Sequence, residues 1–303
     1  MSNLKNKAVV TGGCGFIGSH LVDKLIEKNY DVYVIDDLSA ESNEEFYFND
    51  SAKYFKFDIN DDSIPHKEIF ENAKYVFHLA AESRIGPAIL NPVRATQINA
   101  VGTTKMLQYS RLYNVEKFIY SSTSSVYGNL CKLPTDENEP IDCLNPYSAT
   151  KYSGEQMVEM YTKMYGLKTV VFRYFNVFGE RSPTTGQYAP VIGIFKRQKN
   201  NNESLTIVGT GEQRRDFVHV HDIANVNILA AETPTHDGRN LYNIGTGENI
   251  SINDIAKLIS DDITHIPARE GEAEHTLADI SEAKKHLNYN PTINVRDWIL
   301  KLI

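Results

Sequence analysis

Short apolar runs rich in β-branched and aromatic residues alternate with longer amphipathic segments along the first half of the chain. Such runs predict strands, and strands separated by helices are typical of βαβ units. The strands of βαβ units form a parallel sheet that helices cover on both faces. The predicted strands are Lys7–Thr11, Asp31–Asp36, Tyr54–Phe57, Tyr75–Leu79, Lys117–Ser121 and Thr169–Arg173.

Two of the amphipathic segments predict helices, at Ile17–Lys28 and Tyr147–Tyr165. In the first, apolar residues repeat at helical spacing, so one stripe of the helix packs against the sheet. The stripe consists of Ile17, Leu21, Val22, Leu25 and Ile26.

The pattern changes at Gly179, where the Gly/Pro/Ser/Thr-rich stretch GERSPTTGQYAP predicts a long loop that leaves the sheet. Beyond it, short strands mix with helices, and Asp222 and Ser251 are the predicted N-caps of two helices. The expected strands are Leu205–Val208, Asp216–Val218 and Leu241–Ile244, and the expected helices are Asp222–Ala231 and Ser251–Ile259.

Together these elements predict an α/β protein: a Rossmann-type, doubly wound parallel sheet with a smaller C-terminal α/β substrate lobe. We expect the first domain to span residues 1–178 and to receive residues 216–245 as well. The second lobe then spans residues 179–303.

Composition narrows the classes of function. Of the 303 residues, 41% are hydrophobic and 23% charged, as in an ordinary folded protein with an apolar core. The net charge of −8 and the pI near 5.6 argue against broad binding to nucleic acid or to anionic membranes. No apolar run reaches the roughly 18 residues of a membrane span, and the N-terminus lacks a signal-peptide core. We therefore expect a cytoplasmic protein.

The cysteines Cys14, Cys131 and Cys143 are too few and too irregularly spaced for a disulfide framework or a thiolate zinc site. Histidines could also form a metal site, because His219 and His221 lie on one face of a predicted strand. No third ligand stands at a metal-site spacing from them, so we expect no metal. We expect structural roles for these residues and for His78, which closes the fourth strand.

A glycine array follows the first predicted strand directly and opens the first helix, because GGCGFIGSH places Gly12, Gly15 and Gly18 at GxxGxxG spacing. Gly12 allows a tight turn, Gly15 lets the backbone approach a pyrophosphate, and Gly18 lets the helix pack closely on the strand. The free N–H groups of the helix N-terminus then face the phosphates. The array predicts a dinucleotide site.

Acidic residues at the end of the second strand indicate which dinucleotide binds. Asp36 stands where a carboxylate hydrogen-bonds the adenosine ribose hydroxyls, and Asp37 follows it. No Lys or Arg occurs between Asp36 and Lys53, so nothing local attracts the 2′-phosphate of NADP. We therefore expect NAD as the cofactor.

Tyr147 and Lys151 have the spacing YxxxK, which on a helix places both side chains on one face. An adjacent ammonium lowers the pKa of a phenol, and the phenolate acts as a general base. Hydroxyl groups from Ser121 to Ser125 follow the fifth strand, at the sheet edge where parallel α/β folds bind ligands. Alone, each motif also fits a solvated helix face or a Ser/Thr turn.

Further sequence blocks, in this order, resemble those of the extended short-chain dehydrogenase/reductase family, and in particular its UDP-sugar 4-epimerases. They are TGGCGFIGSH, HLAAESRI, NAVGT, SSTSSVYG, PYSATK, RYFNVFG, GTGEQRRDFVHVHD, YNIGTG and PAREGE. The resemblance covers almost the whole chain and implies an NAD-dependent 4-epimerase of a UDP-hexose or UDP-N-acetylhexosamine. It also implies a homodimer, in which the segments Asn99–Tyr113 and Ser148–Tyr165 of each subunit form a four-helix bundle.

The resemblance assigns roles position by position. Tyr147 is the implied base, Thr123 the implied catalytic hydroxyl, and Lys151 the residue that bridges to the nicotinamide ribose. The implied NAD-binding residues are Gly12, Gly15, Phe16, Ile17, Gly18, Asp36, Asp37, Asp58, Ile59, Leu79, Ala80, Ala81, Asn99, Ser121, Tyr147, Lys151 and Tyr174. The implied substrate-binding residues are Ser83, Thr123, Asn176, Arg215, Arg269 and Thr276.

One position bears on the reaction. Dehydratases and decarboxylases of the superfamily usually have an acid before VYG, where this chain has Ser125. The resemblance therefore favours epimerisation at C4 through a transient 4-ketose. Thr276, near the position that sizes the sugar pocket, leaves room for an acetamido group, so N-acetylhexosamines are expected substrates beside plain hexoses.

Two other functions stay open on the sequence. One is a UDP-glucuronate 4-epimerase or another nucleotide-sugar epimerase or dehydratase, including one that uses a CDP- or GDP-sugar. The other is an inactive NAD-binding sensor or scaffold, against which the intact Tyr147, Lys151 and Thr123 argue.

Overall fold

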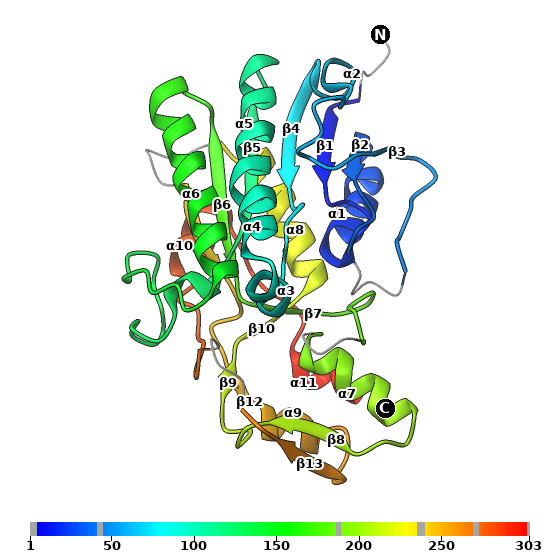
Figure 1. Cartoon of the computed structure of the whole chain (residues 1–303), viewed down its shortest axis with the longest axis vertical. Helices are drawn as coiled ribbons and strands as arrows, with labels where there is room; N and C mark the ends of the chain where they lie inside the picture. Colours follow the sequence, from blue (N-terminus) through cyan, green and yellow to red (C-terminus); the bar gives the residue numbers. More distant parts are fainter. Residues whose placement is uncertain (1–4, 41–44, 186–188, 235–239, 269–272, 302–303) are drawn as a thin grey trace.

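A parallel sheet forms the centre of the molecule in the computed structural model, which describes residues 5–40, 45–185, 189–234, 240–268 and 273–301 (Figure 1). Its seven strands have the order β11-β6-β5-β4-β1-β2-β3, and every neighbouring pair is parallel. They are β1 (Lys7–Thr11), β2 (Asp31–Asp36), β3 (Lys53–Lys56), β4 (Ala73–His78), β5 (Lys117–Thr123), β6 (Thr169–Tyr174) and β11 (Leu241–Ile244). The doubly wound sheet is confirmed.

Helices cover both faces of this sheet (Figure 1). On one face, α1 (Phe16–Glu27) and α8 (Val220–Glu232) share an apolar core with the strands, in which Leu21, Val22 and Leu25 are fully buried. On the other face, α5 (Thr103–Leu112) and α6 (Pro146–Tyr165) enclose a second core. The remaining helical segments of this part are α2 (His66–Phe70), α3 (Ile85–Leu90), α4 (Pro92–Thr96), the π-helix η1 (Gln97–Gly102) and the 3-10 helix η2 (Ser124–Tyr127).

A smaller lobe extends beyond the ends of the strands, at the bottom of Figure 1. Its described residues form three two-stranded sheets, and its core is separate from the two cores of the main sheet. Its strands are β7 (Asn176–Phe178) with β10 (Phe217–His219), β8 (Leu205–Val208) with β13 (Ile263–Ile266), and β9 (Arg214–Arg215) with β12 (Ile250–Ser251). The helices after β7, apart from α8, are α7 (Val191–Asn200), α9 (Ile252–Lys257), α10 (Ser281–Leu287) and α11 (Val295–Leu300).

The N-caps of two helices test the predictions made for the second half. Ser251 caps α9 as predicted, because its hydroxyl accepts the Asp254 N–H at 3.0 Å. Asp222 does not cap α8, and that prediction is wrong: the helix begins earlier, at Val220, with His219 as its N-cap. The Asp222 carboxylate instead accepts the N–H of Thr292 at 3.1 Å, so it ties the C-terminal segment to α8.

The buried His78 has the structural role expected of it. Its ring nitrogens are hydrogen-bonded to the hydroxyls of Thr11 and Thr103, at 2.7 and 2.9 Å. Burial lowers the pKa of His78 to about 3, so the ring is neutral and joins β4 to β1 and α5.

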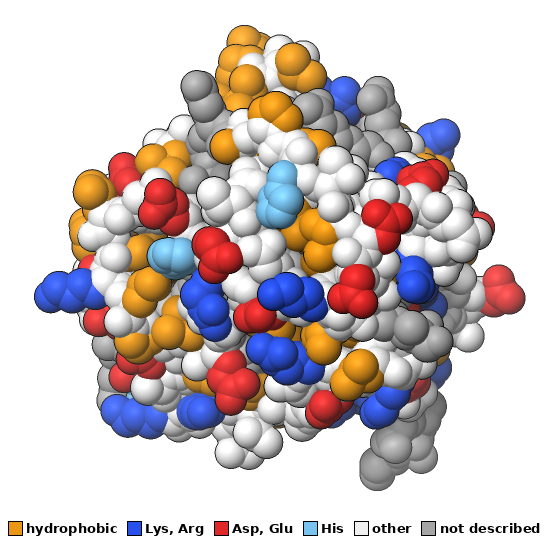
Figure 2. All heavy atoms as spheres, turned by 90° about the horizontal axis from the view of Figure 1, so that it is seen from below, with side chains coloured by type: hydrophobic (Ala, Val, Ile, Leu, Met, Phe, Trp, Pro, Cys, Tyr) orange, Lys and Arg blue, Asp and Glu red, His pale blue; other side chains and the backbone are white. Residues whose placement is uncertain are grey.

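The end of the smaller lobe, seen from below in Figure 2, carries basic and acidic side chains interspersed over its face. None of the helices in the described part is both long and apolar enough to cross a membrane.

Candidate active site

The carboxyl ends of the strands open into a cavity of about 820 Å³ that continues toward the smaller lobe. Nearly all the site residues predicted from the sequence line this cavity: Gly12, Gly15, Phe16, Ile17, Gly18, Asp36, Asp37, Asp58, Ile59, Leu79, Ala80, Ala81, Ser83, Ser121, Thr123, Tyr147, Lys151, Tyr174, Asn176, Arg215 and Thr276. Asn99 lies behind its wall, and Arg269 lies outside the described residues. The fold thus brings the predicted cofactor and substrate residues together.

The glycine loop has the close approaches that a pyrophosphate cradle requires. Gly12 has a φ of +70°, and a Cβ there would lie 2.7 Å from the amide nitrogen of Ala80. A Cβ on Gly18 would lie 2.0 Å from the carbonyl oxygen of Gly12. Helix α1 begins at Phe16 with neither a side-chain cap nor an acid in its first turn, so its N–H groups suit an anion. The loop therefore fits the pyrophosphate of NAD.

Asp36 has a second role that the sequence did not reveal. One carboxylate oxygen accepts the N–H of Cys14 in the glycine loop, and the other accepts the N–H of Leu38, both at 2.9 Å. Burial raises the pKa of Asp36, and these amide hydrogen bonds oppose the rise. Each oxygen keeps a further lone pair for a ribose hydroxyl. Asp36 can therefore hold both the loop and the ribose.

Thr123 and Tyr147 meet at the wall of the cavity. Thr123 is the last residue of β5, and Tyr147 lies in the first turn of α6. A capping box fixes that turn, with the Asn145 side chain accepting the N–H of Ser148 at 2.9 Å. The Thr123 side chain lies close enough to Tyr147 to lower the pKa of its phenol. This pair has the arrangement expected of a base and its hydroxyl partner.

The pKa of Tyr147 contradicts the expectation drawn from the YxxxK motif. Burial raises the pKa of Tyr147, the hydrogen bond with Thr123 lowers it, and the charge of Glu82 raises it further. Burial also lowers the pKa of Lys151 to about 7, so this amine carries only part of a positive charge near neutral pH. Its Nζ lies 4.3 Å from the ring centre of Tyr120. The expected lowering by Lys151 is therefore wrong in this structure.

Glu82 and Asn99 form a unit that the sequence did not predict. Asn99 is fully buried, and its amide group accepts the N–H of Glu82 at 2.9 Å and donates to the Glu82 carbonyl at 3.0 Å. The same side chain donates to the Thr150 hydroxyl on α6 at 3.0 Å. Asn99 thus holds the Glu82 segment, which lines the cavity, against the helix that carries Tyr147.

Tyr174 is held by a buried hydrogen-bond network. Ser121 donates to the Tyr174 hydroxyl at 3.1 Å, and Asn227 on α8 donates to it at 2.7 Å. Burial raises the pKa of Tyr174 to about 12, so its phenol stays neutral. The sequence indicated Ser121 and Tyr174, but Asn227 joins them only through the packing of α8.

The substrate side of the cavity is organised around a buried carboxylate. Asp216 is fully buried and accepts the N–H groups of Gly247 and Ala278, at 3.0 and 3.1 Å. These bonds fix the segment that carries Thr276, whose hydroxyl donates to the Asn176 side chain at 3.3 Å. Arg215 is half-buried beside them and lines the same cavity. Asn176, Arg215 and Thr276 therefore come together as predicted.

Comparison with known proteins shows where this arrangement belongs. The model of the NAD dependent epimerase/dehydratase family matches residues 8–245. The chain belongs to this family. As an epimerase/dehydratase family member it is an enzyme with NAD as its cofactor, which confirms the resemblance seen in the sequence.

Three relatives cover this epimerase/dehydratase family member almost completely. A putative UDP-glucose 4-epimerase of Methanocaldococcus jannaschii is 37% identical over 302 residues, which are 97% of this chain and 96% of that protein. Two solved structures have a TM-score of 0.91 and 35% identity, and each comparison covers 98% of this chain and 97% of the other. They are the UDP-N-acetylglucosamine 4-epimerase of Methanobrevibacter ruminantium with UDP-N-acetylmuramic acid and the UDP-glucose 4-epimerase of Thermotoga maritima with UDP-glucose.

Proposed function

We propose that the chain is an NAD-dependent 4-epimerase of UDP-hexoses and UDP-N-acetylhexosamines. The observation that carries this proposal is the meeting of Thr123 and Tyr147 in the cavity that the glycine loop also lines. Ser125, two residues after Thr123, stands where dehydratases and decarboxylases usually have an acid. The names of the relatives, which are UDP-glucose and UDP-N-acetylglucosamine 4-epimerases, support the same reaction.

The residues of the cavity divide the work of such a reaction. Bound NAD would supply a hydride acceptor that later returns the hydride, so the reaction has no net oxidation. Tyr147 takes the proton of the sugar 4-hydroxyl, and Thr123 orients that oxygen by a hydrogen bond. After the 4-ketose has turned about its diphosphate link, Tyr147 returns the proton. Asn176 and Arg215 hold the diphosphate during the turn, and a guanidinium suits this task.

The size of the residue at Thr276 supports acceptance of an acetamido group. Its hydroxyl is hydrogen-bonded to Asn176 and to the Asp216 amide, each at 3.3 Å, so the side chain is held close to the cavity wall. A large aromatic residue at this position would fill the space beside the sugar. We therefore infer that UDP-GlcNAc and UDP-glucose are both substrates.

A panel of nucleotide sugars tests this function. UDP-glucose, UDP-GlcNAc, UDP-glucuronate and one CDP- and one GDP-sugar are incubated with enzyme and NAD, and inversion at C4 is followed by NMR. We expect turnover of UDP-glucose and UDP-GlcNAc, and a loss of about 100-fold or more in Tyr147→Phe. An undiminished Tyr147→Phe would refute the mechanism. Turnover of UDP-glucuronate alone would favour the rival epimerase, and undetectable UDP-GlcNAc turnover would refute the acetamido inference.

We also propose a homodimer. Large apolar side chains are exposed on the helical layer formed by α3, α4, η1, α5 and α6, among them Val93 (66%), Val101 (48%) and Met164 (71%). In Figure 1, α5 and α6 lie side by side on one face of the sheet, as half of a four-helix bundle would require. The domain division after residue 178 and the cytoplasmic location stay predictions from the sequence.

A further inference from the structure

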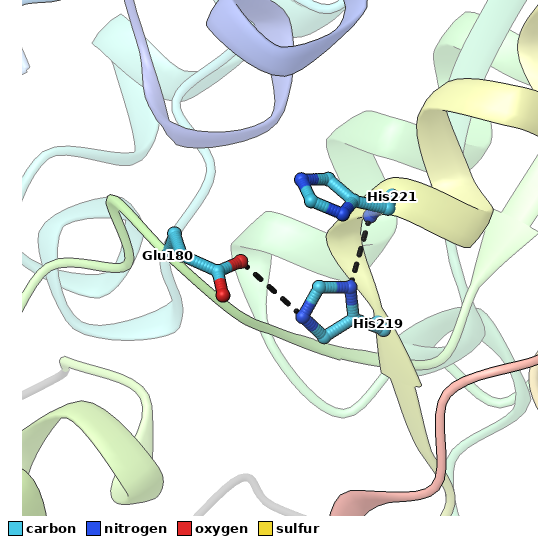
Figure 3. A group of neighbouring side chains, drawn as sticks. All are labelled: Glu180, His219 and His221. Carbon is cyan, nitrogen blue, oxygen red and sulfur yellow. Dashed lines mark hydrogen bonds and ion pairs between the residues drawn. The ribbon is translucent and has the colours of Figure 1, made fainter. Parts of the chain in front are cut away.

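Outside the active site, the fold brings Glu180, His219 and His221 together, as Figure 3 shows. The two histidines lie at the end of β10 and the start of α8. Glu180 follows β7, the parallel neighbour of β10, in which Phe178 pairs with His219. The pairing of the two strands therefore supplies the third side chain that the HVH spacing lacked.

The geometry of this cluster suits a small divalent cation. One ligand atom from each residue lies within 4.8 Å of the others. The Nε2 atom of His219 and a carboxylate oxygen of Glu180 are 3.3 Å apart. Two ligand atoms about 2.0–2.1 Å from a tetrahedral zinc ion are separated by about 3.3–3.4 Å. The separation of the His219 and Glu180 ligand atoms therefore already matches that of two zinc ligands. The third ligand, His221, is exposed, so its side chain can move to bring a ring nitrogen to the same ion.

Two features distinguish the cluster from an accidental gathering of surface residues. The His219 side chain is only 1% exposed, and its Nε2 faces the Glu180 carboxylate at 3.3 Å without completing a hydrogen bond. The second oxygen of Glu180 accepts the indole N–H of Trp298 at 3.1 Å, so a neighbouring residue orients the carboxylate. Ligands held by such outer partners are typical of built metal sites. Arg181, which follows Glu180 in the sequence, is paired with Asp23 at 2.8 Å rather than with the Glu180 carboxylate.

We propose that Glu180, His219 and His221 form a site for a zinc-type divalent metal ion. Imidazole and carboxylate ligands suit this class, and the exposed side of the site leaves a fourth position for water. The ion joins the loop after β7 to the start of α8. His20 of α1 is hydrogen-bonded through Nε2 to the Glu180 carbonyl at 3.0 Å, and its ring centre lies 5.1 Å from that of His221. The ion therefore stabilises the junction of α1, α8 and the smaller lobe.

Metal binding requires a change of tautomer at His219. Its Nδ1 accepts the backbone N–H of His221 at 3.2 Å (Figure 3). An accepting Nδ1 carries no proton, so the proton of the neutral ring is on Nε2. An ion at Nε2 takes the place of that proton, and the neutral ring then carries its proton on Nδ1. The long hydrogen bond to the His221 amide is released in the process. The His221 amide resonance is therefore expected to shift when the metal binds.

The test uses the untagged full chain after dialysis against a chelator. Zinc binding is measured by equilibrium dialysis with elemental analysis in wild type, His221→Ala and Glu180→Gln. The matched control is His265→Ala, which removes an exposed histidine of β13 that lies outside the cluster. We expect one tight zinc ion in wild type and in the control, and affinity lower by about tenfold or more in both cluster variants. Equal affinity in wild type and His221→Ala would overturn the proposal, as would no zinc uptake by wild type.

A second measurement separates a built site from loose binding. Thermal unfolding is followed with and without zinc, together with the His221 amide signal. We expect zinc to raise the Tm of wild type and of His265→Ala, to leave that of His221→Ala unchanged, and to shift the wild-type amide signal. A Tm that rises equally in all variants would overturn the site. Turnover of nucleotide sugars is assayed separately, and we expect His221→Ala to retain it, so the two proposals succeed or fail independently.

Discussion

At the residue scale, the charge of Glu82 offers a direct test of Tyr147 as the base. This charge raises the pKa of Tyr147, beyond the rise that burial causes. Glu82→Gln removes the charge, so the phenolate forms at lower pH. We expect the rising limb of kcat/KM against pH to move to lower pH in Glu82→Gln, and Glu82→Asp to keep the limb near its wild-type position. A limb that moves to higher pH in Glu82→Gln would show that another group controls it.

A substitution at Thr123 should shift the pKa of Tyr147 in the direction opposite to Glu82→Gln. The Thr123 hydrogen bond lowers the pKa of Tyr147, so Thr123→Val raises that pKa and also removes the partner of the sugar hydroxyl. The limb should move to higher pH in Thr123→Val, and kcat should fall by about tenfold to 100-fold. Thr123→Ser keeps the hydroxyl and should restore most of both. Shifts of the same sign in Thr123→Val and Glu82→Gln would contradict the assignment of Tyr147.

The same pair of residues shows what the sequence could not predict. The YxxxK spacing correctly placed Tyr147 and Lys151 on α6 at the cavity, because spacing along a helix is a local property. The direction of the pKa shift depends on how deeply the fold buries each group, and on Glu82, which is far away in the sequence. Neither can be read from a motif.

At the element scale, the start of α1 depends on the absence of a side chain at position 18. A Cβ in Gly18→Ala would meet the Gly12 carbonyl oxygen at 2.0 Å, and this oxygen belongs to the backbone that forms the pyrophosphate cradle. We expect Gly18→Ala to weaken NAD binding by more than about tenfold and to lower the free energy of unfolding by about 1–3 kcal/mol. Calorimetric titration with NAD and urea unfolding measure the two effects.

Gly166 is the matched control for this substitution. It has a φ of +69° at the end of α6, and a Cβ there would have no atom within 4 Å. Gly166→Ala should therefore cost about 1–2 kcal/mol of stability through backbone strain and leave NAD binding unchanged. If Gly166→Ala weakened NAD binding as much as Gly18→Ala, the loss would reflect general destabilisation rather than the cradle.

Helices and strands were predicted correctly where residues close together in the sequence determine them. The strands of the first half and the Ser251 cap are set by runs and caps within a few residues. Asp222 was wrongly predicted as an N-cap because Asp is common at that position. In the structure its carboxylate instead accepts the N–H of Thr292, which is distant in the sequence. Asn227 and Asp216 were missed for the same reason, since their partners lie on other elements.

At the scale of the whole molecule, the parallel sheet explains why so much of the site was predictable. Every strand of the main sheet points the same way, so loops that follow separate strands meet at one edge. Motifs after β1, β2, β4, β5 and β6 therefore line one cavity. The cluster of Glu180, His219 and His221 was not predicted because it depends on the pairing of β7 with β10 in the smaller lobe. A strand of three residues, such as β7, shows too little periodicity to be recognised in the sequence.

The exposed apolar side chains on the helical layer of α3, α4, η1, α5 and α6 lead to a prediction about assembly. Val101 lies on η1 with 48% of its surface exposed, between the helices that we propose to pack against a second subunit. Val101→Arg would bury an unpaired charge in that interface, which costs several kcal/mol. We expect wild type to sediment as a dimer and Val101→Arg to shift toward monomer, with a dissociation constant raised by about 100-fold or more. Leu130→Arg, at a 69% exposed site outside these helices, should remain dimeric. A dimeric Val101→Arg or a monomeric wild type would show that these helices do not form the interface.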